Sequence, residues 1–376
     1  MDKKKVDFYE AVSILVGGII GAGVLGIPYV VAKAGLMTGI IDIVILGFLL
    51  LLLNLYLGEI CLRTRKIHQL TGYAGKYLGK YGKFLMALSF GIGTAGAIVA
   101  YLIGGGEILS SIFGGTPMLM GLIFFAVMSL FIYFDLKAVE KGESIMVTLK
   151  LILIAVVILA GFFFFKSSNL TAFNPSIVFL PYGVILFAFS GAAAIPEAAA
   201  ELKKNRKALK KALLIGSIIP LIVYLLFAIA VVGALGINTP EIATMGLKSL
   251  NSMLFVLGNL FAFLAMATSF LVLGLALKWM FRYDYNLNNF ISWLLACFIP
   301  LGIFLVGTRD FIKVLGVVGA VTVGIDGILI VLMARKAKKK GERKPEYSLP
   351  IPYWLVIVFI LLFLSGIAYQ FYPALA

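Results

Sequence analysis

Long runs of apolar residues fill most of this sequence, and their length is the feature that most limits how the chain can fold. A helix needs about 20 apolar residues to cross a bilayer core of about 30 Å. With 62% hydrophobic and 13% charged residues, the chain has too few polar residues to cover a water-soluble globule. The sequence therefore predicts one all-α, polytopic membrane domain over residues 1–376, surrounded by a lipid bilayer.

Eleven of these runs are long enough to span the bilayer, and we expect a helix in each. The runs cover residues 8–34, 38–62, 84–113, 117–137, 144–166, 177–201, 208–236, 252–279, 289–307, 310–334 and 351–371. The eleventh run is rich in Leu, Ile and Phe, which favours a peripheral position facing lipid.

The basic residues predict how the chain is oriented. The formal net charge is +15, but Lys and Arg lie between the apolar runs and not along one basic face, so we expect no nucleic-acid partner. If the N-terminus is cytoplasmic, 26 of the 32 Lys and Arg residues fall in cytoplasmic segments and five fall outside. Cytoplasmic loops carry such an excess. We therefore expect a multi-pass cell-membrane protein with a cytoplasmic N-terminus and an extracellular C-terminus.

Two of the runs contain helix-breaking residues near their middle. Gly21-Ala22-Gly23 interrupts the first run and Ser190-Gly191-Ala192 the sixth, and a proline follows each break, at Pro28 and Pro196. In lipid, every backbone group freed by such a break needs another partner, so broken backbone persists where it lines a cavity. Broken helices at corresponding positions of two halves are typical of the binding site of a secondary transporter.

The spacing of the breaks predicts an internal repeat. They lie 169 residues apart, with five runs from the first break to the fifth run and five from the sixth to the tenth. Because five is odd, the second half is inverted in the membrane. We expect repeat one at about 8–166, repeat two at about 177–334 and an extra helix at about 351–371.

Several segments resemble known permeases. The stretch Gly17–Pro28 (GGIIGAGVLGIP) resembles the first-helix signature of amino acid permeases in the amino acid-polyamine-organocation superfamily, and residues 187–191 are similar to its general pattern. Residues 70–74 and 267–271 resemble the amino acid/auxin permease branch, which includes bacterial tyrosine and tryptophan permeases. The resemblance implies the leucine-transporter fold, alternating access, and a free amino acid held between the first, third, sixth, eighth and tenth helices.

The breaks themselves are the expected substrate site. Unpaired amides and the positive end of the outer half-helix dipole suit a carboxylate, and free carbonyls suit an ammonium group. The candidate residues are Gly21, Ala22, Gly23, Val24, Phe189, Ser190, Gly191, Ala192, Ala97 and Tyr101. The alternative is that these glycines only allow close helix packing, and that Tyr101 is structural.

The sixth run also bears on the choice of substrate. Residues 192–194 are all alanine where the resemblance leads us to expect an aromatic gate residue, so the pocket is expected to be roomy and apolar. No charged side chain lies clearly at the depth of the breaks to recognise a charged substrate side chain. A neutral, hydrophobic or aromatic amino acid is therefore the expected substrate.

Lys150 is the candidate for ion coupling, because it lies seven residues inside the fifth run. Ionisable residues within the bilayer mark ion pathways or contact a partner, although a lysine can also extend to the interface. The resemblance implies a sodium site at Gly17, Ile20, Ala265, Thr268 and Ser269, and in a proton-coupled class a fifth-helix lysine takes the place of that sodium. We therefore expect proton coupling through Lys150, with sodium coupling as the alternative.

Other classes of protein fit the sequence less well. Asp42, Glu59, Glu107 and Asp326 lie inside apolar runs, where structural hydrogen bonding is the expected role of Glu107 and Asp326. Cys61 and Cys297 have no partner spacing, and no catalytic or metal-ligand cluster lies in the runs, so we expect no enzyme, metal centre or cofactor. Broken helices suit a transporter better than a channel. An exchanger and an amino acid sensor with the same fold remain alternatives.

Overall fold

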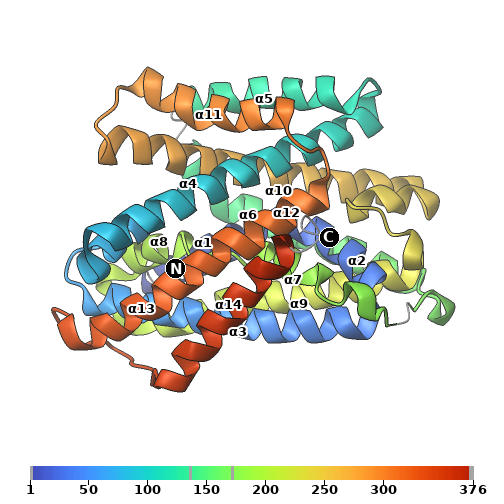
Figure 1. The fold of residues 1–376 in the computed structure, drawn as a ribbon. Coiled ribbons are helices and arrows are strands. Elements are labelled where there is room, and N and C mark those ends of the chain that lie inside the picture. The colour runs from blue at the N-terminus through green and yellow to red at the C-terminus, as the bar shows by residue number, and fades with distance from the viewer. Residues whose placement is uncertain (1–2, 135–137, 171–172, 372–376) are drawn as a thin grey trace.

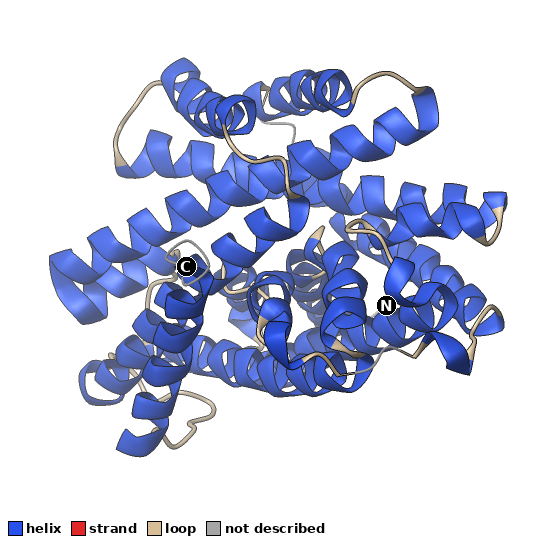
Figure 2. Cartoon of the chain, turned by 45° about the vertical axis from the view of Figure 1, so that its right-hand side comes forward, coloured by secondary structure: helices blue, strands red, loops and turns tan. Residues whose placement is uncertain are grey.

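The computed structural model describes residues 3–134, 138–170 and 173–371. This part of the chain consists of helices and loops, without a β-strand (Figure 2). Eight helices in it are long and apolar enough to cross a membrane, and one bent pair makes a ninth span. The expectation of an all-α polytopic protein is confirmed, whereas the count of eleven spans stays a prediction.

Eight helices are unbroken rods or nearly so: α3 (Leu36–Arg63), α4 (Leu70–Phe113), α5 (Pro117–Tyr133), α6 (Ala138–Phe163), α9 (Leu209–Leu235), α10 (Ser252–Trp279), α11 (Asn289–Val306) and α14 (Tyr353–Phe371). Three predicted spans are divided, into α1 (Lys3–Ile19) and α2 (Gly23–Ala34), α7 (Leu180–Ala188) and α8 (Ala194–Glu201), and α12 (Phe311–Val318), the π-helical η8 (Gly319–Val323) and α13 (Gly324–Lys340). Short helical turns complete the chain: η1 (Ser167–Asn169), η2 (Pro175–Ile177), η3 (Leu202–Lys204), η4 (Arg206–Ala208), η5 (Gly236–Asn238), η6 (Ala243–Ser249) and η7 (Met280–Asp284).

Both breaks expected from the sequence are present. The axes of α1 and α2 differ by 50° across the first break. There the Gly21 amide donates to the Ile19 carbonyl oxygen at 2.9 Å, which closes a tight turn in place of the helical bond. At the second break the Ser190 amide donates to the Phe187 carbonyl oxygen at 3.1 Å, and α8 resumes only at Ala194.

Some predicted boundaries differ from the structure. Residues 70–83 were expected in a cytoplasmic loop, but α4 begins at Leu70 and bends at Gly79, whose φ of 81° is left-handed. This segment is not a continuous apolar run because it is amphipathic. Its buried face carries Leu70, Tyr73, Ala74 and Tyr77, whereas lysines interrupt its other face. The end of the predicted span 117–137 lies outside the described residues.

The two broken helices lie side by side in the middle of the molecule. In Figure 1, α1, α2, α7 and α8 lie between α4 and α10 on one side and α3 and α9 on the other, with α5 and α11 beyond α4 and α10. Contacts join α1 to α8 and α2 to α7, so the two broken helices run antiparallel. This arrangement brings the two gaps in the helices to the same level.

A buried carboxylate holds the linker between α13 and α14 against α3. Glu59 is only 2% exposed, and its oxygens accept hydrogen bonds from Arg63 Nε at 2.8 Å, Lys338 Nζ at 3.0 Å and the Leu349 amide at 2.8 Å. A buried charge persists when it is paired in this way. Glu59 therefore belongs to the scaffold that fixes α14 on the bundle.

Candidate functional site

Small residues let the two breaks touch. A Cβ atom added at Gly23 would lie 2.6 Å from the Ala188 Cα atom, and one added at Gly191 would lie 2.3 Å from Ile19 Cγ1. Real Cβ atoms essentially never approach so closely. The glycines are therefore needed for close helix packing as well as for the breaks, and the packing role expected as an alternative is present.

Tyr224 joins the two breaks from α9. Its side chain is fully buried, and its hydroxyl lies 2.8 Å from the Ile19 carbonyl oxygen and 2.9 Å from the Ala188 carbonyl oxygen. These are the last carbonyls of α1 and α7, which lack a helical partner. The Tyr224 ring also packs against Phe189, with centroids 4.8 Å apart. Sequence reasoning missed Tyr224, although a tyrosine inside an apolar run signals a hydroxyl that needs a partner.

The first break presents free backbone donors. Within the described chain, the amides of Ala22 and Val24 make no hydrogen bond, and Gly23 begins the outer half-helix. Val24 is fully buried, so its amide faces the protein interior. Free amides at the positive end of a helix suit a carboxylate. At the second break the Ser190 hydroxyl donates to the Phe187 carbonyl oxygen at 2.7 Å.

Two hydroxyls from other helices border the first break. A Cβ atom at Gly21 would lie 2.9 Å from Ser269 Oγ and 3.7 Å from the Tyr101 hydroxyl oxygen. Tyr101 is 3% exposed, and Ala97, one turn earlier on α4, is 2% exposed. Ala192 lies in the second break and is partly exposed. The structure thus brings α4 and α10 to the broken helices, as expected from the sequence.

Lys150 reaches the first break from α6. Its side chain is 3% exposed, and Nζ lies 3.2 Å from the Ile20 carbonyl oxygen and 3.3 Å from Thr268 Oγ1. Thr268 gives its own proton to the Leu264 carbonyl oxygen at 2.8 Å, so its oxygen is available as an acceptor. The lysine amine therefore points to the first break.

The other residues considered for an ion lie nearby with different contacts. The Ala265 carbonyl oxygen is 3.3 Å from Thr268 Oγ1, and Ala265 is fully buried. Ser269 faces Gly21 at the first break. Gly17 lies on α1, three residues before Ile20. Of the predicted set, Ile20 and Thr268 are thus the residues that contact Lys150.

The ends of α1 and α8 that lie away from the breaks bring three carboxylates together. Asp7, Glu10 and Glu201 place one oxygen each within 4.8 Å of one another. Glu197 and Glu201 each have a further interaction partner. Exposed acidic groups often gather without an ion, so the cluster assigns no metal site.

The segment from η5 to η6 packs against α2. Glu241, between η5 and η6, accepts hydrogen bonds from the Phe311 and Ile312 amides at the start of α12. Asp310 caps the same helix, accepting from the Lys313 amide at 2.7 Å. Burial, and next the negative charge of Asp310, raise the pKa of Glu241. The segment from η5 to η6 is therefore fastened to α12 on this side.

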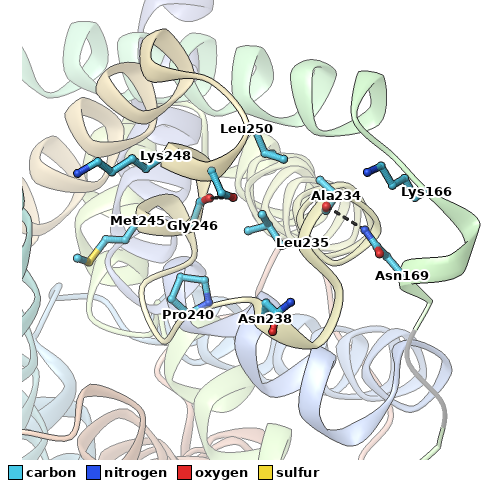
Figure 3. A pocket seen from close by; sticks show the side chains of 11 residues that line it. Lys166, Asn169, Ala234, Leu235, Asn238, Pro240, Met245, Gly246, Lys248 and Leu250 are labelled. Carbon is cyan, nitrogen blue, oxygen red and sulfur yellow. Dashed lines mark hydrogen bonds between the residues drawn. The ribbon is translucent and has the colours of Figure 1, made fainter.

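A pocket of about 730 Å³ lies away from the breaks, where α6 and α9 end (Figure 3). Asn169 lies at its edge and donates to the carbonyl oxygens of Gly233 and Ala234 at 3.0 and 2.9 Å. Lys166 and Lys248 lie on its rim. None of the candidate site residues lines this pocket, so it is separate from the expected substrate site.

The chain is similar in sequence to two transporters over nearly its whole length. The chain is 25% identical to glutamine transporter 2 of Aliivibrio fischeri over 90% of this chain and 91% of the relative. It is 28% identical to tyrosine-specific transport system 1 of Haemophilus influenzae, over 93% of this chain and 92% of the relative.

The fold also matches a solved transporter structure. MhsT in complex with L-phenylalanine superposes with a TM-score of 0.70, covering 97% of this chain and 98% of that chain at 14% sequence identity. The expected leucine-transporter fold is therefore confirmed. The sequence matches the model of the tryptophan/tyrosine permease family over residues 4–370. The chain thus belongs to the tryptophan/tyrosine permease family, a family of amino acid transporters, and is a multi-pass membrane protein.

Proposed function

We propose that this protein is a secondary active transporter that takes up a neutral, hydrophobic or aromatic amino acid by alternating access, coupled to protons. The observation that carries the proposal is the meeting of two broken helices, with free amides at Ala22 and Val24 and the Lys150 amine on the Ile20 carbonyl. Such a site binds a zwitterion through backbone dipoles and places an ionisable group beside it.

The substrate class follows from what surrounds the breaks. The amides of residues 22–24 hold the carboxylate, and the carbonyls at Phe189 and Ser190 receive the ammonium group. Ala97, Tyr101, Gly191 and Ala192 border the substrate side chain, and the alanines leave room for a large one. The names of the relatives mention glutamine and tyrosine, and the solved neighbour holds L-phenylalanine, all of them neutral amino acids. These names support a neutral substrate.

The coupling ion follows from the position of Lys150. Its ammonium group lies beside the Ile20 carbonyl and Thr268 hydroxyl, which would otherwise be oxygen ligands for sodium. A like charge at that distance opposes a bound cation. Protonation and deprotonation of the amine then replace sodium binding and release. The second candidate is a sodium symporter, which the same oxygens support if Lys150 moves away during transport.

The antiparallel packing of α1 on α8 and α2 on α7 supports the inverted repeat of residues 8–166 and 177–334. In the proposed orientation the N-terminus is cytoplasmic and the C-terminus extracellular. The rocking of one set of helices about the breaks would then expose the site to each side in turn. Two alternatives fit the same geometry. An exchanger swaps amino acids across the membrane without net uptake, and a sensor binds an amino acid without transporting it.

The decisive experiment imposes pH and sodium gradients separately on proteoliposomes that contain the purified protein. We expect an inward proton gradient, and not a sodium gradient, to drive accumulation of labelled L-tyrosine. Unlabelled L-tryptophan, L-phenylalanine and L-glutamine test competition, and L-arginine and L-glutamate should not compete. In Lys150→Met, proton-driven accumulation should be lost. Accumulation that follows sodium and ignores pH would reject proton coupling, and exchange without net uptake would identify an exchanger.

A further inference from the structure

An acidic residue in the tenth span has an oxygen without a partner. Asp326 lies on α13, one turn after η8, and its Oδ1 atom is buried with no hydrogen-bond partner among the described residues. None of the ion pairs in the described chain includes Asp326. An ionised carboxylate in such a place carries a large desolvation penalty, which protonation removes.

The hydrogen-bond directions around Ser89 of α4 point the same way. Ser89 is 2% exposed, and its hydroxyl donates to the Thr322 carbonyl oxygen at 3.1 Å. The Asp326 carboxyl group is within hydrogen-bonding reach of that hydroxyl. A serine hydroxyl has one proton, which Thr322 receives, so towards Asp326 it can only accept. A hydrogen bond between them therefore needs a proton on Asp326.

The elements packed around Asp326 supply no cation at its level. The charged residues nearest along these elements are Lys83 on α4, Glu59 on α3 and Arg335 on α13, while α14 contains no Asp, Glu, Lys, Arg or His. Lys83 lies six residues before Ser89, about 9 Å along a helix, and is exposed. Glu59 is likewise six residues from Leu53, which contacts the α13 backbone at Gly327. Neutralisation by a neighbouring charge is therefore not available to Asp326.

The turn that contains Thr322, whose carbonyl oxygen accepts from Ser89, packs closely against the second broken helix. Thr322 belongs to the π-helical η8, and such turns recur at functional sites. A Cβ atom at Gly319, where η8 begins, would lie 2.7 Å from the Phe187 amide nitrogen on α7. The Phe187 carbonyl in turn accepts the Ser190 hydroxyl inside the break. The break, η8 and the Ser89–Thr322 hydrogen bond are therefore joined by direct contacts.

We propose that Asp326 is a second proton-binding residue of the transport cycle, protonated in the conformation described here and deprotonated when η8 rearranges. The inference rests on the proposed proton-coupled transport. In the step, the O–H bond of the Asp326 carboxyl group breaks, its electron pair stays on the carboxylate and the proton passes to water. The Ser89 hydroxyl then turns from Thr322 to Asp326, where it donates to the carboxylate and stabilises the ionised form.

The test combines a measurement on the acid itself with one on transport. Infrared spectra of the purified protein in liposomes should show a C=O stretching band of a protonated carboxyl group that is missing from Asp326→Asn. Asp310→Asn is the matched control, because it makes the same chemical change at the cap of the same span, in a loop, and should keep the band. Ser89→Ala should keep the band but shift its frequency, because the protonated Asp326 carboxyl group loses its hydrogen-bond acceptor.

Transport then tests whether the proton moves. With labelled L-tyrosine as probe and a lumenal pH dye, Asp326→Asn should carry one proton fewer per amino acid than the wild type, while counterflow continues. An infrared band unchanged in Asp326→Asn would overturn the protonated state. A band that disappears with unchanged proton stoichiometry would overturn the role in coupling. Sodium-driven uptake would reject the proposed function, yet the infrared result would still decide the state of Asp326.

Discussion

At the scale of single residues, one hydroxyl on α9 links the two half-helices whose ends form the site. Tyr224 is fully buried, and the carbonyls of Ile19 and Ala188 share its proton. Both carbonyls lie at the negative ends of helix dipoles, where a donor stabilises them. Because the ring also packs on Phe189, Tyr224 fixes the spacing of the breaks from behind the site.

Tyr224→Phe removes this donor and leaves the ring in place. The Ile19 carbonyl keeps its hydrogen bond from the Gly21 amide, but the buried Ala188 carbonyl loses its donor. A buried acceptor without a partner costs about 1–3 kcal/mol, so we expect a lower melting temperature and weaker binding of L-tyrosine. Tyr182→Phe is the control, because the Tyr182 hydroxyl donates to the Leu362 carbonyl oxygen at 3.0 Å, between α7 and α14. It should lower stability with little change in binding. Equal effects of the two variants on binding would contradict the assigned role of Tyr224.

At the scale of elements, the broken first span depends on the lack of side chains at its gap. Gly21 lies directly against Ser269 of α10, and Gly23 against the backbone of α7 at Ala188. The same contacts explain why α1 and α2 are not one continuous rod: the gap lets α4, α10 and α7 approach the chain. The break is thus maintained by packing between helices and by glycine's low helix propensity together.

Gly21→Ala should nearly abolish uptake, because its Cβ atom would lie 2.9 Å from Ser269 Oγ. Ser269→Ala removes that oxygen, after which the nearest atoms would lie 3.7 Å away, at an ordinary contact distance. The double variant Gly21→Ala/Ser269→Ala should therefore recover uptake relative to Gly21→Ala. Gly302→Ala on α11 has nothing within 4 Å and should transport like the wild type. A double variant no better than Gly21→Ala would show that the clash is not the cause.

At the scale of the whole molecule, the charge distribution predicts which end of the bundle faces the cytoplasm. The exposed Lys248 lies in the last turn of η6 at one end, and the exposed Lys340 ends α13 at the other. The native Cys61 and Cys297 are buried, at 5% and 0% exposure, so they should not react with an impermeant maleimide. Labelling of an engineered surface cysteine can therefore be measured without first replacing the two native cysteines.

Lys248→Cys should be labelled by an impermeant maleimide in intact cells, and Lys340→Cys only after permeabilisation. The reason is that the positive-inside rule assigns the Lys- and Arg-rich segments to the cytoplasm. The unmodified chain provides the blank for background labelling. Labelling of Lys340→Cys in intact cells, with Lys248→Cys protected, would reverse the orientation.

Most of the fold could be predicted from the sequence because its strongest constraints are local. Apolar length specifies spanning helices, and small residues near the middle of a run with a proline soon after them indicate where a helix breaks. The break at Gly21–Gly23 followed from residue positions along the first run, and the approach of Lys150 to Ile20 and Thr268 followed from the resemblance to permeases. The start of α4 at Leu70 could not be predicted in this way, because this segment has an amphipathic pattern that is shorter and more charged than a membrane-spanning run.

The sequence by itself determined the class of the protein, the positions of the two breaks and the residues at the depth of the site. Only the tertiary structure decided the partners: Tyr224 against the ends of α1 and α7, Ser269 against Gly21, and Ser89 between Asp326 and Thr322. The spacing of apolar residues and the composition of each run specify the helices and their apolar faces. The rotation of each helix about its own axis, however, depends on its packing against all of its neighbours. Which polar groups meet inside the bundle is therefore fixed only when the helices assemble.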